Sequence, residues 1–178
     1  MRGMILRNLV RGPYTEPAPQ VSDEALAELA TAVNRVAMRR LGRSLSIRAV
    51  DAGSCNGCEL EIHALNNAIY DLERFGLRFV ASPRHADVLL VTGPVTKNMC
   101  EALERTYRAT PDPTWIVAVG DCAVSGGLFS KSYAVIGSVN AVTPVDLDIP
   151  GCPPSPEQLL KGLLALLSDG VDRRSIRP

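Results

Sequence analysis

Short apolar segments alternate with helix-like segments from residue 45 to residue 167, and this alternation constrains the fold more than any other feature of the chain. Residues 88–92 and 115–119 are apolar at nearly every position, so both faces of each strand are expected to be buried. Strands of this kind that alternate with helices belong to parallel sheets, because right-handed crossovers place helices on both faces. The sequence therefore predicts an α/β fold with a mostly parallel sheet.

The expected elements follow from the period of the apolar residues and from the residues that start and stop helices. We expect strands at 45–50, 77–81, 88–92, 115–119 and 145–149, a weaker one around 133–139, and helices at 59–75, 96–108 and 156–167. This domain is expected to span residues 44–170, followed by a C-terminal tail at 171–178.

Residues 1–43 are predicted to form an N-terminal arm that ends in an amphipathic helix. Ser22 is a suitable N-cap, apolar residues recur at helical spacing as far as Leu41, and Gly42 stops the helix. Its last turns are rich in arginine. Packing on its own domain and contact with a partner subunit or a membrane surface remain alternatives.

Composition excludes several classes of function. The 19 basic and 19 acidic side chains give a formal net charge of zero, and aromatic residues make up 4% of the chain, so no nucleic-acid partner is expected. No apolar run reaches the ~18 residues of a membrane span, and the N-terminal apolar patch is too short for a secretory signal. We therefore expect a cytoplasmic protein, in which cysteines are more often metal ligands than disulfides.

Four of the five cysteines follow predicted strands directly. Cys55 and Cys58 follow the strand at 45–50, Cys122 follows 115–119, and Cys152 follows 145–149. Because the carboxyl ends of parallel strands meet at one edge of a sheet, all four thiols are expected at the same edge. The sequence therefore predicts one metal site.

The residues around these cysteines favour an iron-sulfur cluster over zinc, although zinc also accepts four cysteines. Glycines beside each loop allow backbone N–H groups to approach a bulky anionic group, and Pro150, Pro153 and Pro154 stiffen the loop of Cys152. One C-x-x-C pair completed by two distant single cysteines is unlike the paired knuckles of structural zinc modules. A structural metal protein without a redox role stays an alternative, whereas a flavin is disfavoured because thiols occupy the first strand-to-helix loop.

Six motifs, in order along nearly all of residues 44–167, resemble those of a known family. They are Ser54-Cys55-Asn56-Gly57-Cys58-Glu59, Glu73-Arg74-Phe75-Gly76, Ser82-Pro83-Arg84-His85-Ala86-Asp87, Thr92-Gly93-Pro94-Val95-Thr96, Gly120-Asp121-Cys122-Ala123 and Pro150-Gly151-Cys152-Pro153-Pro154. The chain is similar to the small electron-transfer subunit shared by energy-converting NiFe hydrogenases and respiratory complex I, in which it is the 20 kDa subunit. The nearest branch is the group 4 membrane-bound hydrogenases, including the formate-hydrogenlyase and CO-induced types.

The resemblance implies a flavodoxin-like fold, and an oxidoreductase subunit that is not catalytic alone. It implies one 4Fe-4S cluster, ligated by Cys55, Cys58, Cys122 and Cys152. The implied partners are a NiFe large subunit, a ferredoxin-like iron-sulfur subunit and integral membrane subunits, which would hold the chain at the inner face of the cell membrane. Complex I subunits have two adjacent cysteines at the first pair, so the C-x-x-C spacing here favours hydrogenase. The terminal-cluster subunit of a complex-I-like NADH/quinone oxidoreductase remains the alternative.

Several other residues could have either a structural or a functional role. Glu59 and Glu61 either favour the start of a helix or relay protons. Arg84 and His85 belong either to a solvated loop or to an interface near the cluster, in which case His85→Ala would alter turnover. Cys100 is expected to be a buried structural thiol. Asp121 departs from the small apolar residue of many relatives, and Asp121→Ala is expected to raise the midpoint potential.

Overall fold

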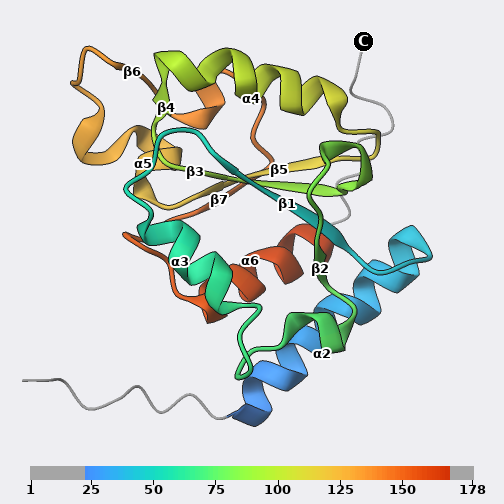
Figure 1. The fold of residues 1–178 in the computed structure, drawn as a ribbon. Coiled ribbons are helices and arrows are strands. Elements are labelled where there is room, and N and C mark those ends of the chain that lie inside the picture. Colours follow the sequence, from blue (N-terminus) through green and yellow to red (C-terminus); the bar gives the residue numbers. More distant parts are fainter. Residues whose placement is uncertain (1–22, 169–178) are drawn as a thin grey trace, which may run out of the picture.

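The computed structural model describes residues 23–168, and its helices and strands alternate as the sequence predicted (Figure 1). The first 22 residues of the predicted arm and the predicted tail at 171–178 lie outside the described residues. The helices are α2 (Asp23–Leu41), α3 (Gly57–Ala64), α4 (Lys97–Ala109), α5 (Asp121–Ser125) and α6 (Pro156–Ser168), and short 3-10 turns are η1 (Leu72–Phe75), η2 (Pro83–His85), η3 (Gly127–Phe129) and η4 (Val139–Ala141). The strands are β1 (Ser46–Asp51), β2 (Arg78–Phe79), β3 (Val88–Thr92), β4 (Val95–Thr96), β5 (Trp115–Val119), β6 (Val135–Gly137) and β7 (Leu147–Ile149).

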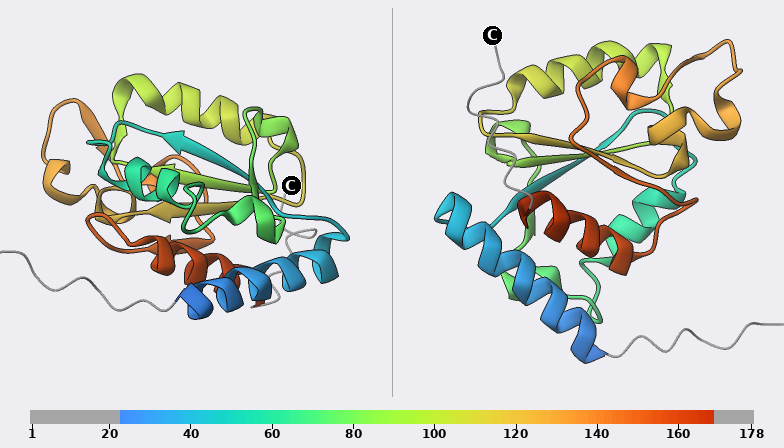
Figure 2. Two further views of the ribbon diagram at one scale, coloured as in Figure 1. Left: turned by 60° about the horizontal axis from the view of Figure 1, so that its bottom comes forward. Right: turned by 180° about the vertical axis from the view of Figure 1, so that it is seen from behind.

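Five strands form one sheet in the order β2-β1-β3-β5-β7, and every neighbouring pair is parallel. This order is that of the flavodoxin-like doubly wound fold, which confirms the predicted fold class. Helices α2, α3 and α6 cover one face, and α4 covers the other (Figure 2). A small antiparallel pair of β4 and β6 lies apart from this sheet and was not predicted as a separate sheet.

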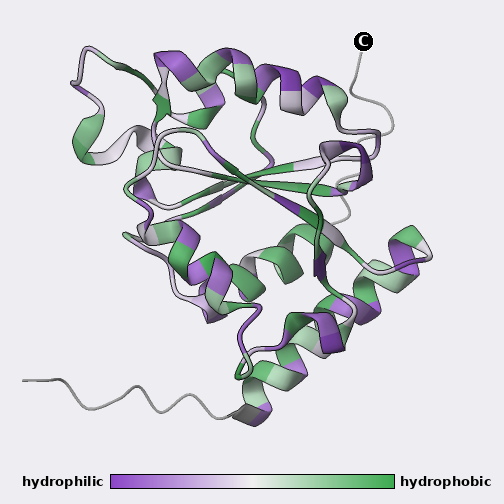
Figure 3. Ribbon diagram, in the orientation of Figure 1, coloured by the Kyte–Doolittle hydropathy of each residue, from purple (hydrophilic) through white to green (hydrophobic). Residues whose placement is uncertain are grey.

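The central strands are apolar because they are covered on both faces. All residues of β3 and β5 are buried, and alternate side chains enter two different cores. Leu90 packs with the α2, α3 and α6 side, whereas Leu89 and Val91 pack with the α4 side. The hydropathy colours follow this arrangement, with hydrophobic strands inside and hydrophilic residues on the outer surface of α4 (Figure 3).

Helix α2 is an integral part of this core. Leu26, Ala30, Val33 and Ala37 recur at helical spacing, are buried, and belong to the core on the α6 side. The helix therefore packs on its own domain, which was one of the two alternatives from the sequence. Within the described residues, no helix is both long and apolar enough to cross a membrane.

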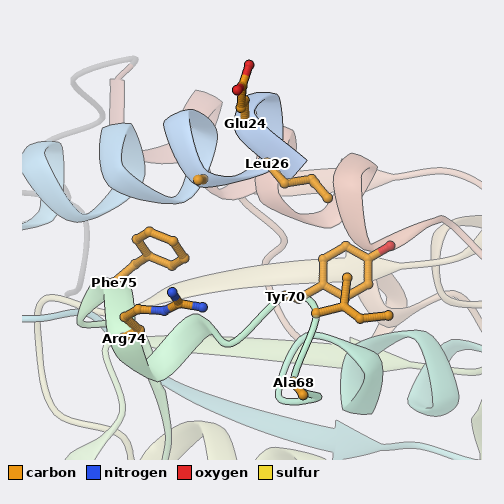
Figure 4. Close-up of a pocket in the computed structure, with 8 residues that line it drawn as sticks. Glu24, Leu26, Ala68, Tyr70, Arg74 and Phe75 are labelled. Carbon is orange, nitrogen blue, oxygen red and sulfur yellow. The ribbon is translucent and has the colours of Figure 1, made fainter. Parts of the chain in front are cut away.

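The helix predicted at 59–75 is wrong in its second half, because α3 ends at Ala64. The Asn67 side chain accepts hydrogen bonds from the backbone N–H groups of Ile69 and Tyr70, at 2.8 and 3.0 Å. Such local bonds compete with helical ones, and Asp71 has a left-handed φ of 41°. The resulting turn, η1 and the start of α2 line an open pocket of about 620 Å³ (Figure 4).

Candidate metal centre

Four cysteines line a single cavity of about 100 Å³ at the carboxyl edge of the sheet. Cys55 and Cys58 come from the loop after β1 and the start of α3, Cys122 from the start of α5 after β5, and Cys152 from the loop after β7. The remaining lining residues are Ser54, Gly57, Gly93, Asp121, Gly151 and Pro153. The structure thus brings together the four thiols that the sequence predicted as one site.

The loop between β1 and α3 is held by side-chain hydrogen bonds. Asp51 accepts from the backbone N–H groups of Gly53 and Ser54, both at 2.7 Å, and Ser54 Oγ accepts from the N–H of Asn56 at 2.9 Å. Asn56 adopts a left-handed conformation with φ 71°, which asparagine tolerates better than most residues. This turn places Cys55 and Cys58 on either side of the start of α3.

Glu59 connects the same turn to the sheet through hydrogen bonds. Its carboxylate accepts a hydrogen bond from Ser54 Oγ at 2.5 Å and a short one from Thr92 Oγ1 at the end of β3. Its neighbour Cys58 is therefore anchored between the helix and the central strand. Of the two interpretations of Glu59, this contact supports a structural one, although the proton relay stays a prediction.

Two glycines leave room for sulfur. A Cβ atom on Gly120 would lie 2.6 Å from Cys58 Sγ, and one on Gly127 would lie 2.8 Å from Cys122 Sγ. Both glycines have positive φ, at 88° and 51°, where other residues are strained. The backbone therefore approaches two of the four sulfurs more closely than a residue with a side chain would allow.

The four thiols are near enough to disturb one another electrostatically. Burial raises the pKa of Cys58 to about 12, with further upward contributions from Glu59, Cys55, Cys122 and Cys152. Burial also raises the pKa of Cys122, together with Cys152, Cys55 and Asp121, whereas a backbone hydrogen bond from Leu128 lowers it. Four thiolates crowded in this way are stable only with a positive group between them.

The thiols surround a space rather than a point. Among residues 23–168, no three Cys, His, Asp or Glu side chains are arranged as ligands of a single metal ion. Tetrahedral zinc needs four sulfurs at ~2.3 Å from one centre, whereas a cluster carries its irons at the corners of a larger body. The cavity and the close glycines therefore fit a 4Fe-4S cluster, for which four thiols are a suitable donor set.

The other predicted site residues are less closely associated with this cavity. Glu61 lies half-buried on α3, outside the cavity lining. Arg84 and His85 are exposed in η2, which leads into the amino end of β3, so they lie at the sheet edge opposite the cysteines (Figure 1). This placement supports the solvated-loop interpretation, and a role at a subunit interface stays a prediction. Cys100 is half-buried on α4 against the second core, as expected for a structural thiol.

A protein-family comparison matches residues 55–166 to the model described as NADH ubiquinone oxidoreductase, 20 Kd subunit. That range contains all four cysteines and more than half of the chain. The chain belongs to this 20 kDa subunit family. Its members are subunits of oxidoreductase complexes, which agrees with the resemblance seen in the sequence.

Relatives come from both hydrogenases and quinone oxidoreductases. Formate hydrogenlyase subunit 7 of Escherichia coli is 41% identical over 89% of this chain, which spans only 62% of that relative's length. The "Probable membrane-bound hydrogenase subunit mbhJ" of Pyrococcus furiosus is 46% identical over 71% of this chain and 76% of its own length. A subunit of the NADH-quinone oxidoreductase of Bacteroides thetaiotaomicron is 49% identical over 70% of this chain and 64% of its own length.

One solved structure is similar to this chain in both fold and sequence. A chain of the membrane-bound sulfane sulfur reductase, an archaeal respiratory membrane complex, is 34% identical with a TM-score of 0.64, covering 79% of this chain and 77% of that chain. Proteins similar to this chain thus occur in hydrogenase, quinone oxidoreductase and sulfane sulfur reductase complexes, and overall identity alone does not separate their reactions.

Three hydrogen bonds at the site were not predicted from the sequence. The Glu59 carboxylate reaches Ser54 and Thr92, and the Asp121 carboxylate accepts a hydrogen bond from the backbone N–H of Gly151 at 2.8 Å. The sequence marked Glu59 and Asp121 as notable, yet it carried no signal for their hydrogen-bond partners in other loops and in β3.

Proposed function

We propose that this chain is the electron-transfer subunit of a membrane-associated NiFe hydrogenase complex. Cys55, Cys58, Cys122 and Cys152 would hold one 4Fe-4S cluster, which passes electrons one at a time to or from the nickel-iron site of a large subunit. The observation that carries the proposal is the convergence of these four thiols, from three loops, on one cavity. A ferredoxin-like subunit and integral membrane subunits would complete the complex, and would place the chain at the inner face of the membrane.

The protein's own part is to hold the ligands and to restrict what surrounds them. Gly120 and Gly127 admit sulfur against the backbone, and the N–H of Leu128 hydrogen-bonds to Cys122. Hydrogen bonds to ligand sulfurs are one of the determinants of cluster potential. Cys58 is the more buried of the two thiols with raised pKa, so its environment excludes more water.

The spacing of the first cysteine pair supports hydrogenase rather than quinone chemistry. Cys55 and Cys58 are separated by two residues, whereas the resemblance associates adjacent cysteines with complex I. The relatives from formate hydrogenlyase and the Pyrococcus hydrogenase support the same choice. The NADH-quinone oxidoreductase relatives keep the terminal-cluster subunit of a complex-I-like enzyme as the second candidate.

The cluster is tested with the full chain purified without oxygen. About four irons and four sulfides per chain, a brown colour and an EPR signal on reduction are expected. Cys122→Ser should lose most of this iron, because one ligand is lost. Cys100→Ser, which removes a thiol outside the cavity, should keep it. A colourless chain that binds one zinc per chain would contradict the proposal.

The reaction is tested with the complex that the chain forms with its genomic neighbours. The purified complex should evolve or oxidise hydrogen with a viologen dye, and Cys122→Ser should abolish this activity. Quinone reduction without hydrogen activity would instead establish the complex-I-like alternative.

A further inference from the structure

The two loops that carry single cysteines are joined immediately before each cysteine. Strands β5 and β7 pair in parallel with Val119 opposite Ile149. Beyond the strands, the N–H of Gly120 donates to the carbonyl of Ile149 at 2.8 Å, and the N–H of Asp121 donates to the carbonyl of Gly151 at 2.9 Å. The ladder of the sheet therefore continues to the residues that precede Cys122 and Cys152.

The Asp121 side chain completes this ladder where the backbone cannot. After Asp121 the chain turns into α5, so its next carbonyls point along the helix and away from the loop after β7. The N–H of Gly151 donates to Asp121 Oδ1 at 2.8 Å instead. The two residues thus exchange a reciprocal pair of hydrogen bonds, one through backbone and one through the carboxylate. Gly151 has a φ of 137°, so this geometry also depends on glycine.

We propose that Asp121 is a positioning residue that clamps the loops of Cys122 and Cys152 at the separation a cluster needs. The identity of the bound group rests on the proposed function, whereas the clamp is a property of the chain alone. The clamp needs an oxygen acceptor and not a negative charge. It therefore differs from the electrostatic effect on midpoint potential that the sequence suggested for Asp121.

Asparagine separates the two roles, because its side-chain oxygen accepts the same hydrogen bond without charge. We compare Asp121→Ala with Asp121→Asn, and use Asp148→Asn as a control that removes an exposed carboxylate three residues before Gly151. The first readout is exchange of the Gly151 amide hydrogen in the metal-free full chain, followed by NMR. The second is the rate of iron release to a chelator from the cluster-loaded chain.

In Asp121→Ala, the Gly151 amide should exchange about tenfold faster and iron release should accelerate about tenfold, as expected for loss of one hydrogen bond. Asp121→Asn and Asp148→Asn should both stay within about twofold of the original chain. If Asp121→Asn instead matches Asp121→Ala, charge is the cause and the clamp is wrong. Unchanged amide exchange in Asp121→Ala would also overturn it. An unaltered chain that binds no iron refutes the proposed function, and the amide measurement still decides the clamp.

Discussion

Replacement of Gly120 by alanine tests whether the backbone must lie against the sulfur of Cys58. The new Cβ would lie 2.6 Å from Sγ, and ordinary contact begins at 3.4 Å, so ordinary contact is restored only when the two atoms separate by a further 3.4 − 2.6 = 0.8 Å. Metal-ligand distances tolerate only ~0.2 Å of error. Cys58 cannot retreat easily, because Glu59 beside it is bonded to Ser54 and Thr92. Gly120→Ala should therefore lose most of the bound iron.

Backbone strain alone would also weaken the variant, so a matched control is needed. Gly137→Ala has a comparably unfavourable φ of 141°, but nothing lies within 4 Å of its new Cβ. Both variants should lose about 1–3 kcal/mol of unfolding free energy in the metal-free chain. Iron and sulfide content per chain, with the EPR signal, separates them. Full iron content in Gly120→Ala, or equal loss in Gly137→Ala, would refute the close-contact explanation.

Three further predictions concern residues away from the cysteines. Asp87 is 2% exposed and accepts hydrogen bonds from Arg43 and from the N–H of Ser46. Asp87→Ala should cost about 2–3 kcal/mol in urea unfolding, since the buried Ser46 donor loses its partner while half-exposed Arg43 turns to water. Glu101→Ala breaks an ion pair that is exposed on both sides and should cost about 0.5 kcal/mol or less. His85→Ala should leave the turnover of the complex and the EPR spectrum unchanged, and altered turnover would support the interface interpretation.

The sequence was most informative where burial alone determines structure. Strands β3 and β5 begin and end at the predicted residues, because a short continuous apolar run bounded by turn residues fits a strand covered on both faces. The four cysteines were placed at one edge of the sheet because the carboxyl ends of parallel strands meet there. The same argument places Arg84 and His85 at the opposite edge, since their loop precedes β3 and therefore lies at the amino end of that strand.

Two kinds of feature were not predictable in this way: side-chain hydrogen bonds that compete with helix formation, and the register between strands that are distant in the sequence. Helix α3 stops early because the Asn67 side chain binds the backbone N–H groups of Ile69 and Tyr70, a choice that periodicity does not reveal. The pairing of Asp121 with Gly151 depends on the register between β5 and β7, which are separated by 27 residues from Val119 to Leu147. Such contacts follow only from the folded arrangement.

The raised pKa of Cys58 connects the geometry of the site to pH. Its thiol keeps a proton up to about pH 12 in the folded metal-free chain, whereas the unfolded chain loses it near pH 9.0. Between these values the folded state binds more protons than the unfolded state, so stability falls as pH rises. Urea unfolding should show that the free energy of unfolding of the metal-free chain falls between pH 8.5 and pH 10.5. The fall should be smaller in Cys58→Ala, which lacks this thiol. Equal falls in the two proteins would contradict the raised pKa. Because metal ligation requires the thiolate, cluster insertion must release this proton. Glu59 therefore has two effects at the site: its charge helps to raise the pKa of Cys58, and its hydrogen bond to Ser54 holds the turn that carries this cysteine.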